Sequence, residues 1–570
     1  MKILVLGGYG VFGGRLIDLV ADVNAFEILV CGRSADKAEA FCARRQSGAR
    51  LVPLRLDRSD VDLALQQQRP DVLVDASGPF QDYGDDRYSV VESCIRQRVN
   101  YLDFADGSEF VSGIDQFNEA AQRAGVFVLS GVSSFPVLTA AVIDELQHGM
   151  DIHKVTAGIA PSPYAGVGMN VMRAVLGYAG GPVRLTRAGK LTAVGGLTES
   201  LRYTVSPPGY LPLRNLRFSL VDVPDLRVIP QVFPQIRDIW VGAGPVPEFL
   251  HRLLNLIAKI RSAWYLPSLA PFAGVCYWVI NHLRYGEHRG GMFVEVEGQV
   301  AGKVDSGETG EAHSDQQRGF EKRSWHLLAE GDDGPYIPSM AIEILLRKLE
   351  NGDAPDAGAR PAIATLTLQD YERVFAGRQI YSGIRRPPAP QDNLFAAVLG
   401  DKFAALPKSV REFHEVTGSS EWVGPATVTA ASGLLARLIA RLFRFPTRTQ
   451  QTSVRVLVQR SAEREHWTRS FGTAEFHSTL TAGSGREEQL ICEKMGLATI
   501  ALAIVLDGES LQFLPRRWRI GPLPLPRFLL PGGNSFEREA DGQFVFDVKL
   551  ELPVIGLLVA YQGTLARASD

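Results

Sequence analysis

A strand, a glycine-rich turn and a helix begin at the second residue, and this order constrains the fold more than any other feature. The apolar run 2–6 leads into a G-x-G-x-x-G turn, and a helical apolar pattern follows through 15–20. In such a turn Gly8 permits a sharp bend, Gly10 a close approach of backbone to a pyrophosphate, and Gly13 tight packing of helix on strand. The helix N-terminus favours an anion. We therefore expect dinucleotide contacts from Gly8, Tyr9, Gly10, Val11, Phe12 and Gly13.

The end of the second expected strand, 26–30, indicates which dinucleotide binds. An NAD site usually has an acidic residue about twenty residues after the glycine turn, to bind the ribose 2′-hydroxyl. Here Cys31 takes that place, and Arg33, Ser34 and Lys37 follow. A guanidinium offers a planar fork of donors to a 2′-phosphate, so we predict NADP(H). The alternative is that Arg33 only caps the next helix in solvent.

Alternating strands and helices continue through the first 130 residues. Further strands are expected at 50–56, 71–76, 101–105 and 126–130, which predicts βαβ units on a parallel sheet. Ligands of such sheets bind beyond the carboxyl ends of the strands. The additional cofactor contacts predicted there are Asp57, Ser77, Gly78, Pro79, Phe80, Ser133, Phe135 and Pro136.

The motifs GGYGVFG, CGRS, VDASGPFQDYG, VVESCIRQRVNYLDFADG and LSGVSSFPVLTAAVID occur in this order. Together they resemble the NADP-binding domain of the saccharopine-dehydrogenase-like family. The resemblance implies a Rossmann-type domain over 1–139, with the turn 78–80 lining the cofactor cleft, and Tyr101 and Asp103 match the family's Tyr-x-Asp strand. At 133–136 the chain has Ser-Ser-Phe-Pro where amino-acid-linked members often carry an acid or a cysteine with Asp-Pro-Gly, which argues against an amino-acid substrate.

Composition excludes several classes of protein. The chain has 570 residues and a formal net charge of -3, which is unlike a nucleic-acid binder. Its five cysteines lack C-x-x-C spacing, so neither a disulfide framework nor a metal site is expected. No signal peptide precedes the first strand, and we expect a cytoplasmic protein.

The middle region, 140–386, is predicted to be an α+β substrate and dimerisation domain with a mixed sheet. Strands are expected at 154–159, 185–194, 292–299 and 324–330. By the family resemblance, a helix within 335–350 packs back on the nucleotide domain. Basic residues in this region could bind carboxylate or phosphate groups, or could form a solvated strand face; they are Arg184, Arg187, Lys190, Arg202, Arg214 and Arg217.

The segment 249–283 is unusually apolar. Its part 266–283 contains no Asp, Glu, Lys or Arg, but Pro267 and Pro271 argue against a membrane-spanning helix. An interfacial helix touching the inner membrane, or a lid over a lipid-like substrate, is one interpretation. A buried core or homodimer-interface helix is the other.

No sequence motif fixes the catalytic residues. Hydride transfer to C=N or C=C needs positioning beside the nicotinamide and one proton donor. The candidates at strand ends are Tyr83, Asp103 and Asp106, although both aspartates could equally bind loop N–H groups. His282 and His288 are weaker candidates.

A proline run at 385–390 predicts a linker before a C-terminal domain at 391–570. Helices are expected at 394–416 and 434–443, and then antiparallel strands at 452–459, 465–471, 498–506, 510–520, 543–550 and 556–565, forming a curved sheet or half-barrel. This part resembles a bacterial domain of unknown function found behind such reductases. Its concave face could hold a hydrophobic ligand.

We therefore predict an NADPH-dependent oxidoreductase that transfers hydride to an imine or enoyl carbon of a small, hydrophobic substrate. One alternative is a reductase of C=N bonds in amino-acid or polyamine conjugates. Another is a protein that binds NADPH, or a lipid surface, without turnover.

Overall fold

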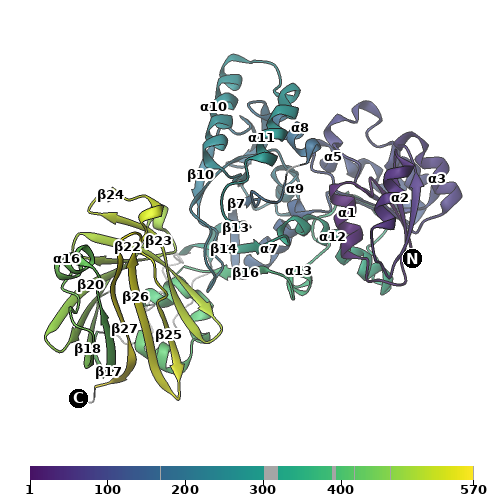
Figure 1. Cartoon of the computed structure of the whole chain (residues 1–570). Helices are drawn as coiled ribbons and strands as arrows, with labels where there is room; N and C mark the ends of the chain where they lie inside the picture. The colour runs from purple at the N-terminus through teal and green to yellow at the C-terminus, as the bar shows by residue number, and fades with distance from the viewer. Residues whose placement is uncertain (167, 301–318, 388–392, 416–417, 462–463, 569–570) are drawn as a thin grey trace, which may run out of the picture. The chain divides into compact units, whose positions relative to one another are not determined.

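The computed structural model describes residues 1–166, 168–300, 319–387, 393–415, 418–461 and 464–568 (Figure 1). The chain forms two compact units. The first comprises 1–203 and 216–382, and the second comprises 204–215 and 383–570. The segment 204–215, which the sequence analysis assigned to the middle domain, thus belongs to the second unit. The division into 1–139, 140–386 and 391–570 stays a prediction.

Parallel strands form the nucleotide-binding sheet, as predicted. Their order among the described residues is β15 (Gly358–Pro361), β6 (Phe127–Ser130), β5 (Asn100–Asp103), β4 (Val72–Asp75), β1 (Lys2–Leu6), β2 (Glu27–Gly32) and β3 (Arg50–Arg55). The connecting helices are α1 (Val11–Leu19), α2 (Ala35–Ala43), α3 (Val61–Gln68), α4 (Ser89–Gln97), α5 (Ser108–Ser112), α6 (Asn118–Ala124) and α7 (Thr139–Leu146). The central strands are buried and apolar, as expected where helices cover both faces of a sheet.

The chain returns to this sheet after the middle region. The edge strand β15 pairs in parallel with β6, and the sequence analysis did not predict it. The expected return helix is α12 (Ile337–Glu350), which packs on α1. Ser339 Oγ donates to the carbonyl of Phe12 at 3.3 Å, and Arg347 pairs with Asp22 at 2.8 Å. These contacts fix the return helix behind the glycine turn.

The middle region contains the predicted mixed sheet. Its order is β10 (Ser200–Tyr203), β11 (Leu216–Leu220), β12 (Asp238–Ala243), β7 (Met150–Ala160), β13 (Arg289–Val300), β14 (Gly319–Glu330) and β16 (Ile380–Arg385). The single strand expected at 185–194 is wrong. A turn with positive φ at Ala188 and Gly189 divides it into a hairpin, β8 (Pro182–Arg187) and β9 (Lys190–Gly195).

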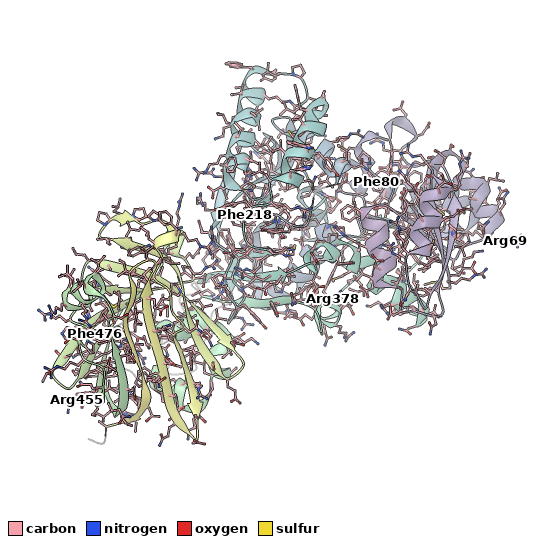
Figure 2. All side chains as sticks on the ribbon, in the orientation of Figure 1. Arg69, Phe80, Phe218, Arg378, Arg455 and Phe476 are labelled. Carbon is pink, nitrogen blue, oxygen red and sulfur yellow. The ribbon has the colours of Figure 1, made fainter. Side chains whose placement is uncertain are left out.

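Helices accompany the mixed sheet, and in Figure 1 α8, α10 and α11 lie together beyond one end of it. The helices of this region are α8 (Met169–Tyr178), α9 (Asp225–Val232), α10 (Glu248–Trp264), α11 (Ala273–His282) and α13 (Leu368–Phe375). Within the described part of the chain, no helix combines the length and hydropathy that crossing a membrane requires. Labelled in Figure 2, Phe218 on β11 is fully buried and packs edge-to-face on Phe293.

The second unit is an antiparallel barrel with helices. Its strands follow the order β22 (Ala498–Asp507), β21 (Ile491–Met495), β20 (Ala474–Ala482), β19 (Arg464–Phe471), β18 (Gln450–Ser461), β17 (Ser419–Ala430), β27 (Gly556–Arg567), β26 (Gln543–Leu552), β25 (Phe536–Ala540), β23 (Ser510–Ile520) and β24 (Leu523–Pro524). Pairing of β22 with β23 closes the sheet, so the expected half-barrel is corrected to a closed one. The sequence analysis missed β17, β20, β21, β24 and β25.

Short helices accompany the barrel, and they are α14 (Leu394–Leu399), α15 (Lys408–Glu415) and α16 (Leu434–Leu442). The single helix expected at 394–416 is broken at Gly400, which has a φ of 53°. Residue 416 and the second half of the predicted proline linker, 388–390, lie outside the described residues. The barrel interior is largely filled by apolar side chains, including Phe476 (Figure 2). A cavity of about 100 Å³ remains there, beside Arg469, which pairs with Glu493.

Candidate active site

The glycine turn follows β1 and brings backbone into close contact with the next strand of the sheet. Gly7 has a φ of +79°, and a Cβ there would lie 2.7 Å from the carbonyl oxygen of Ala76. The sharp bend that the sequence analysis assigned to Gly8 is therefore made by Gly7. A Cβ on Gly13 would lie 2.5 Å from the Gly7 carbonyl oxygen, which agrees with the close-packing role predicted for this position.

A cleft of about 630 Å³ opens beyond the carboxyl ends of β1, β2, β3 and β4. This is the topological switch point of the sheet, where the chain leaves β1 for one side and β4 lies on the other. Helix α1 begins at Val11, next to Gly10, and its first residues line this cleft. The predicted residues that line it are Tyr9, Gly10, Val11, Phe12, Arg33, Asp57, Ser77, Gly78, Pro79, Phe80, Tyr83 and Asp106.

The end of the cleft at β2 contains Tyr9, Gly32 and Arg33. The ring of Tyr9 lies against Gly32, where an added Cβ would be 2.3 Å from the ring, and its hydroxyl accepts a hydrogen bond from Ser34 N at 3.0 Å. The Ser34 hydroxyl caps α2. Arg33 is exposed, and the structure shows no ion pair for it within the described residues. Its guanidinium therefore remains available to an anion in the cleft.

A hydrogen-bonded chain runs from the core of the sheet into the cleft at the end of β4. Asp75 is fully buried, and its carboxylate accepts from Ser77 Oγ at 2.5 Å and from Arg58 at 2.6 Å. The Ser77 hydroxyl lies 2.9 Å from the Tyr83 hydroxyl. Because Ser77 donates its proton to Asp75, its oxygen accepts from Tyr83.

Electrostatics keep the Tyr83 phenol protonated at neutral pH. Burial raises the pKa of Tyr83 well above its ordinary value, and the nearby Asp75 carboxylate raises it further. Arg58 acts in the opposite direction, since its guanidinium lies 3.7 Å from the centre of the Tyr83 ring and stabilises the phenolate. Tyr83 is thus a hydrogen-bond donor at the cleft, with a cation placed to support loss of its proton.

The other two catalytic candidates differ in position. Asp103 is fully buried and does not line the cleft; its carboxylate accepts from Ala105 N at 2.9 Å and from Gly131 N at 2.7 Å. It thereby joins the end of β5 to the loop after β6. Asp106 lines the cleft, and its Oδ1 accepts from Gln81 at 3.0 Å. The structural alternative for Asp103, binding of loop N–H groups, is the arrangement observed.

Several predicted residues lie away from the cleft lining. They are Gly8, Gly13, Ser34, Lys37, Asp103, Ser133, Phe135 and Pro136, together with His282 and His288. The basic stretch of the middle region does not line it either: Arg187 pairs with Glu199, and Arg202 pairs with Glu248. Within the described residues, no group of three or more His, Cys, Asp and Glu side chains is arranged to hold a metal ion.

Residues that the sequence analysis missed complete the cleft. Arg58 follows Asp57, and the start of α8 supplies Met169, Asn170 and Arg173. Asn170 donates to the carbonyl of Gly78 at 2.7 Å, so the middle region contacts the turn after β4 directly. Arg58 follows β3 and Asp75 ends β4, two strands that are not neighbours in the sheet, so the sequence did not signal this pair, and no motif marks the start of α8.

Comparison with known proteins agrees with this geometry. Residues 3–129 match the family described as "Saccharopine dehydrogenase NADP binding domain". This part of the chain is therefore similar to a saccharopine dehydrogenase NADP-binding domain, which supports NADP(H) as the cofactor and an oxidoreductase as the class of protein. Residues 406–565 match a domain of unknown function, DUF4166, so both resemblances noted in the sequence are confirmed.

Solved structures resemble the chain only distantly. One is apo saccharopine dehydrogenase (L-Glu forming) from Saccharomyces cerevisiae, with 14% identity over 68% of this chain and 99% of that chain and a TM-score of 0.47. Another is amine dehydrogenase from Mycobacterium smegmatis, with 11% identity over 63% and 94% and a TM-score of 0.30. A third is myo-inositol dehydrogenase from Lactobacillus casei, with 12% identity over 69% and 99% and a TM-score of 0.29. No curated protein sequence matches the chain.

The residues of the cleft fit NADP(H). Backbone at Gly7 and Gly10 leaves no room for a side chain, as expected where a diphosphate approaches the main chain. The N-terminus of α1 supplies N–H donors for the diphosphate. Arg33 is placed at the end of β2, where the adenosine ribose of such cofactors binds, with its charge available for a 2′-phosphate.

Proposed function

We propose that the protein transfers hydride from NADPH to an imine or enoyl carbon of a hydrophobic small molecule, with Tyr83 as the proton donor. The observation that carries this proposal is the chain from Asp75 through Ser77 to Tyr83, which ends in the cofactor cleft. Bound NADPH supplies the hydride, and the protein must supply position and one proton.

Tyr83 is suited to donate that proton. After hydride reaches carbon, negative charge develops on the neighbouring atom of the substrate: nitrogen in an imine, or the enolate of an enoyl group. The Tyr83 hydroxyl, whose proton is donated to Ser77 before substrate binds, rotates that proton toward this group, transfers it and becomes a phenolate. The Arg58 guanidinium stabilises this phenolate from its position over the ring, and Asp75 holds Arg58 there.

The lining of the cleft supports an apolar substrate. The cleft that Tyr83 lines is also lined by Phe80, Phe104 and Met169, and Phe12 stacks on Phe104 with ring centroids 5.6 Å apart. Apolar walls of this kind suit an acyl or isoprenoid chain better than a zwitterionic amino acid. One cation, Arg173, is exposed at the α8 side of the cleft. That residue supports the second candidate, reduction of a C=N bond in a conjugate that carries a carboxylate.

A substrate screen with purified protein tests both candidates. Oxidation of NADPH would be followed with 2-enoyl thioesters and unsaturated lipids in one panel, and with imines of amino acids and polyamines in another. Wild type would be compared with Tyr83→Phe and with Arg173→Ala. We expect turnover in the first panel that depends on Tyr83 and not on Arg173. Turnover confined to the second panel and lost in Arg173→Ala would establish the C=N candidate instead.

A third outcome would overturn the proposal. If NADPH binds tightly but neither panel is reduced, and if Tyr83→Phe binds NADPH as wild type does, the protein binds the nucleotide without turnover. The predicted homodimer and cytoplasmic location are separate proposals. Sedimentation velocity and fractionation of cells would test them.

A further inference from the structure

We propose that α10, α11 and the segment between them dock on an anionic lipid surface. Large apolar side chains along these helices point into solvent, and we call this surface the apolar helical face. Trp264 is 72% exposed, Phe272 61%, Val275 66% and Trp278 61%. On α10, Phe249 and Leu256 are also more than half exposed. A cluster of large apolar side chains that are exposed to solvent usually marks a binding surface.

The contacts on the inner side of α10 fix which side of the helix is exposed to solvent. His251, Asn255 and Ala258 are buried on the opposite side. Asn255 donates to the carbonyl of Leu197 at 2.9 Å and to Ser219 Oγ at 3.0 Å. These bonds fix the rotation of α10, so its apolar outer side cannot turn inward without breaking them.

The positive charge of this segment favours an anionic binding partner. Residues 248–286, which include all of α10 and α11, contain four basic side chains and one acidic one, Glu248, a formal charge of +3, while the whole chain has -3. Lys259 and Arg284 are exposed and have no ion-pair partner within the described residues. Aromatic and aliphatic side chains beside lysine and arginine are the composition of helices that lie in the headgroup region of anionic membranes.

A second copy of the chain is a poorer occupant. A two-fold interface would place the same surface on both partners, so +3 would face +3, and the one acidic residue of the segment, Glu248, already pairs with Arg202 and Arg252 of its own chain. An anionic lipid surface satisfies the basic residues and covers the apolar ones at once.

The apolar helical face is one helix away from the cofactor cleft. Met172 and Leu176 of α8 pack against Ala273 of α11, and the start of α8 lines the cleft through Met169 and Asn170. A membrane-docked protein would therefore present the cleft near a source of lipid-like substrate. This consequence rests on the proposed function, but the docking does not.

The test uses the full chain and vesicles of phosphatidylcholine, with or without phosphatidylglycerol. Binding would be measured by co-sedimentation, without NADPH or substrate, so failed docking is distinguishable from failed catalysis. We expect binding to the anionic vesicles, reduced by salt and by Lys259→Glu with Arg284→Glu. Trp264→Ser with Trp278→Ser should reduce it about tenfold or more. The matched control is Leu63→Ser with Leu191→Ser, two exposed apolar residues of the same unit outside this segment.

Two results would overturn the proposal. One is that wild type does not sediment with anionic vesicles, or that the tryptophan variant binds as wild type does. The other is that wild type is a dimer without vesicle binding and becomes a monomer when Trp264 and Trp278 are replaced, which would make this face an interface between copies. Binding of each variant to NADPH checks that the first unit remains folded.

Discussion

The hydroxyl oxygens of Ser77 and Tyr83 lie 2.9 Å apart, and Ser77 is at the same time bonded to the buried carboxylate of Asp75. The orientation of Tyr83 is therefore linked to the core of the sheet through Ser77, which itself lines the cleft. A proton donor held in this way loses little freedom when a substrate binds, which is a general requirement of precise catalytic positioning.

Replacing Tyr83 by phenylalanine should lower kcat with the identified substrate by roughly 10²- to 10⁴-fold, the range for loss of a general acid. The affinity for NADPH should not change, because the hydroxyl is assigned to the substrate. Steady-state kinetics and fluorescence titration would measure the two effects. Tyr88→Phe removes a hydroxyl that bonds to the carbonyl of Phe110 outside the cleft lining, and it serves as the control. Equal loss in both variants would argue for a structural role.

Replacing Arg33 by alanine should weaken binding of NADPH by about 1.5–3 kcal/mol, the range for a hydrogen bond with a charged partner. Binding of NADH, which lacks the 2′-phosphate, should be almost unaffected. Titration of intrinsic fluorescence with each nucleotide measures both. Arg44→Ala, an exposed arginine outside the cleft lining, is the matched control. A similar loss for both nucleotides would mean that Arg33 does not contact the 2′-phosphate.

Stability should depend on pH through Asp103. Burial raises the pKa of Asp103 to about 7, above its unfolded value of about 3.9. The folded state thus binds the extra proton between these values, so the free energy of unfolding falls as pH rises from about 4 to about 7. Asp103→Asn keeps an acceptor for Gly131 and Ala105 but cannot ionise. Urea unfolding at several pH values should show a slope smaller by up to roughly 1.4 kcal/mol per pH unit in this variant. Parallel slopes for both proteins would exclude the effect.

The stability of the second unit should depend on Arg385. Its buried guanidinium donates to the carbonyls of Ser206 at 2.6 Å and Val398 at 2.8 Å. Arg385→Met removes these charge-assisted bonds and leaves both carbonyls without the guanidinium donor. We therefore expect the free energy of unfolding to fall by at least about 1.5–3 kcal/mol. Chemical unfolding followed by near-UV circular dichroism would report it. The exposed neighbour Arg386 provides the control variant Arg386→Met, which should unfold as wild type does.

The sequence predicted those elements of the fold that depend on residues close to one another in the chain. The glycine turn and six of the seven strands of the parallel sheet depend on residues close in sequence, whereas α12 was expected from the family resemblance, and the structure contains all of these. The break at Gly400 and the hairpin turn at Ala188 were missed because one residue with positive φ overrides an otherwise continuous pattern. Closure of the barrel could not be predicted, since it depends on pairings such as β17 with β27, whose residues are far apart in the chain.

The residues of the candidate site also fall into those that the sequence predicted and those that it did not. Residues of the glycine turn and Arg33 were predicted because the dinucleotide motif has fixed spacing. Tyr83 was predicted from its place after a strand end, but its partners were not. Arg58 reaches Asp75 from another strand end, and Asn170 comes from the middle region. Contacts of this kind are set by the packing of separate elements, which one sequence does not display.

The segment 204–215 has a consequence for synthesis of the protein. It is translated between two strands of the first unit, yet its Gly209 carbonyl accepts from Leu506 N at 2.8 Å, and Leu211 packs on Ala501 and Ala503 in the second. This piece leaves the ribosome long before β22 exists, so it has to remain without its final partners while the first unit folds around it. For the same reason, a C-terminal fragment starting after residue 383 would lack part of its own structure, and the two halves of the chain are not interchangeable modules.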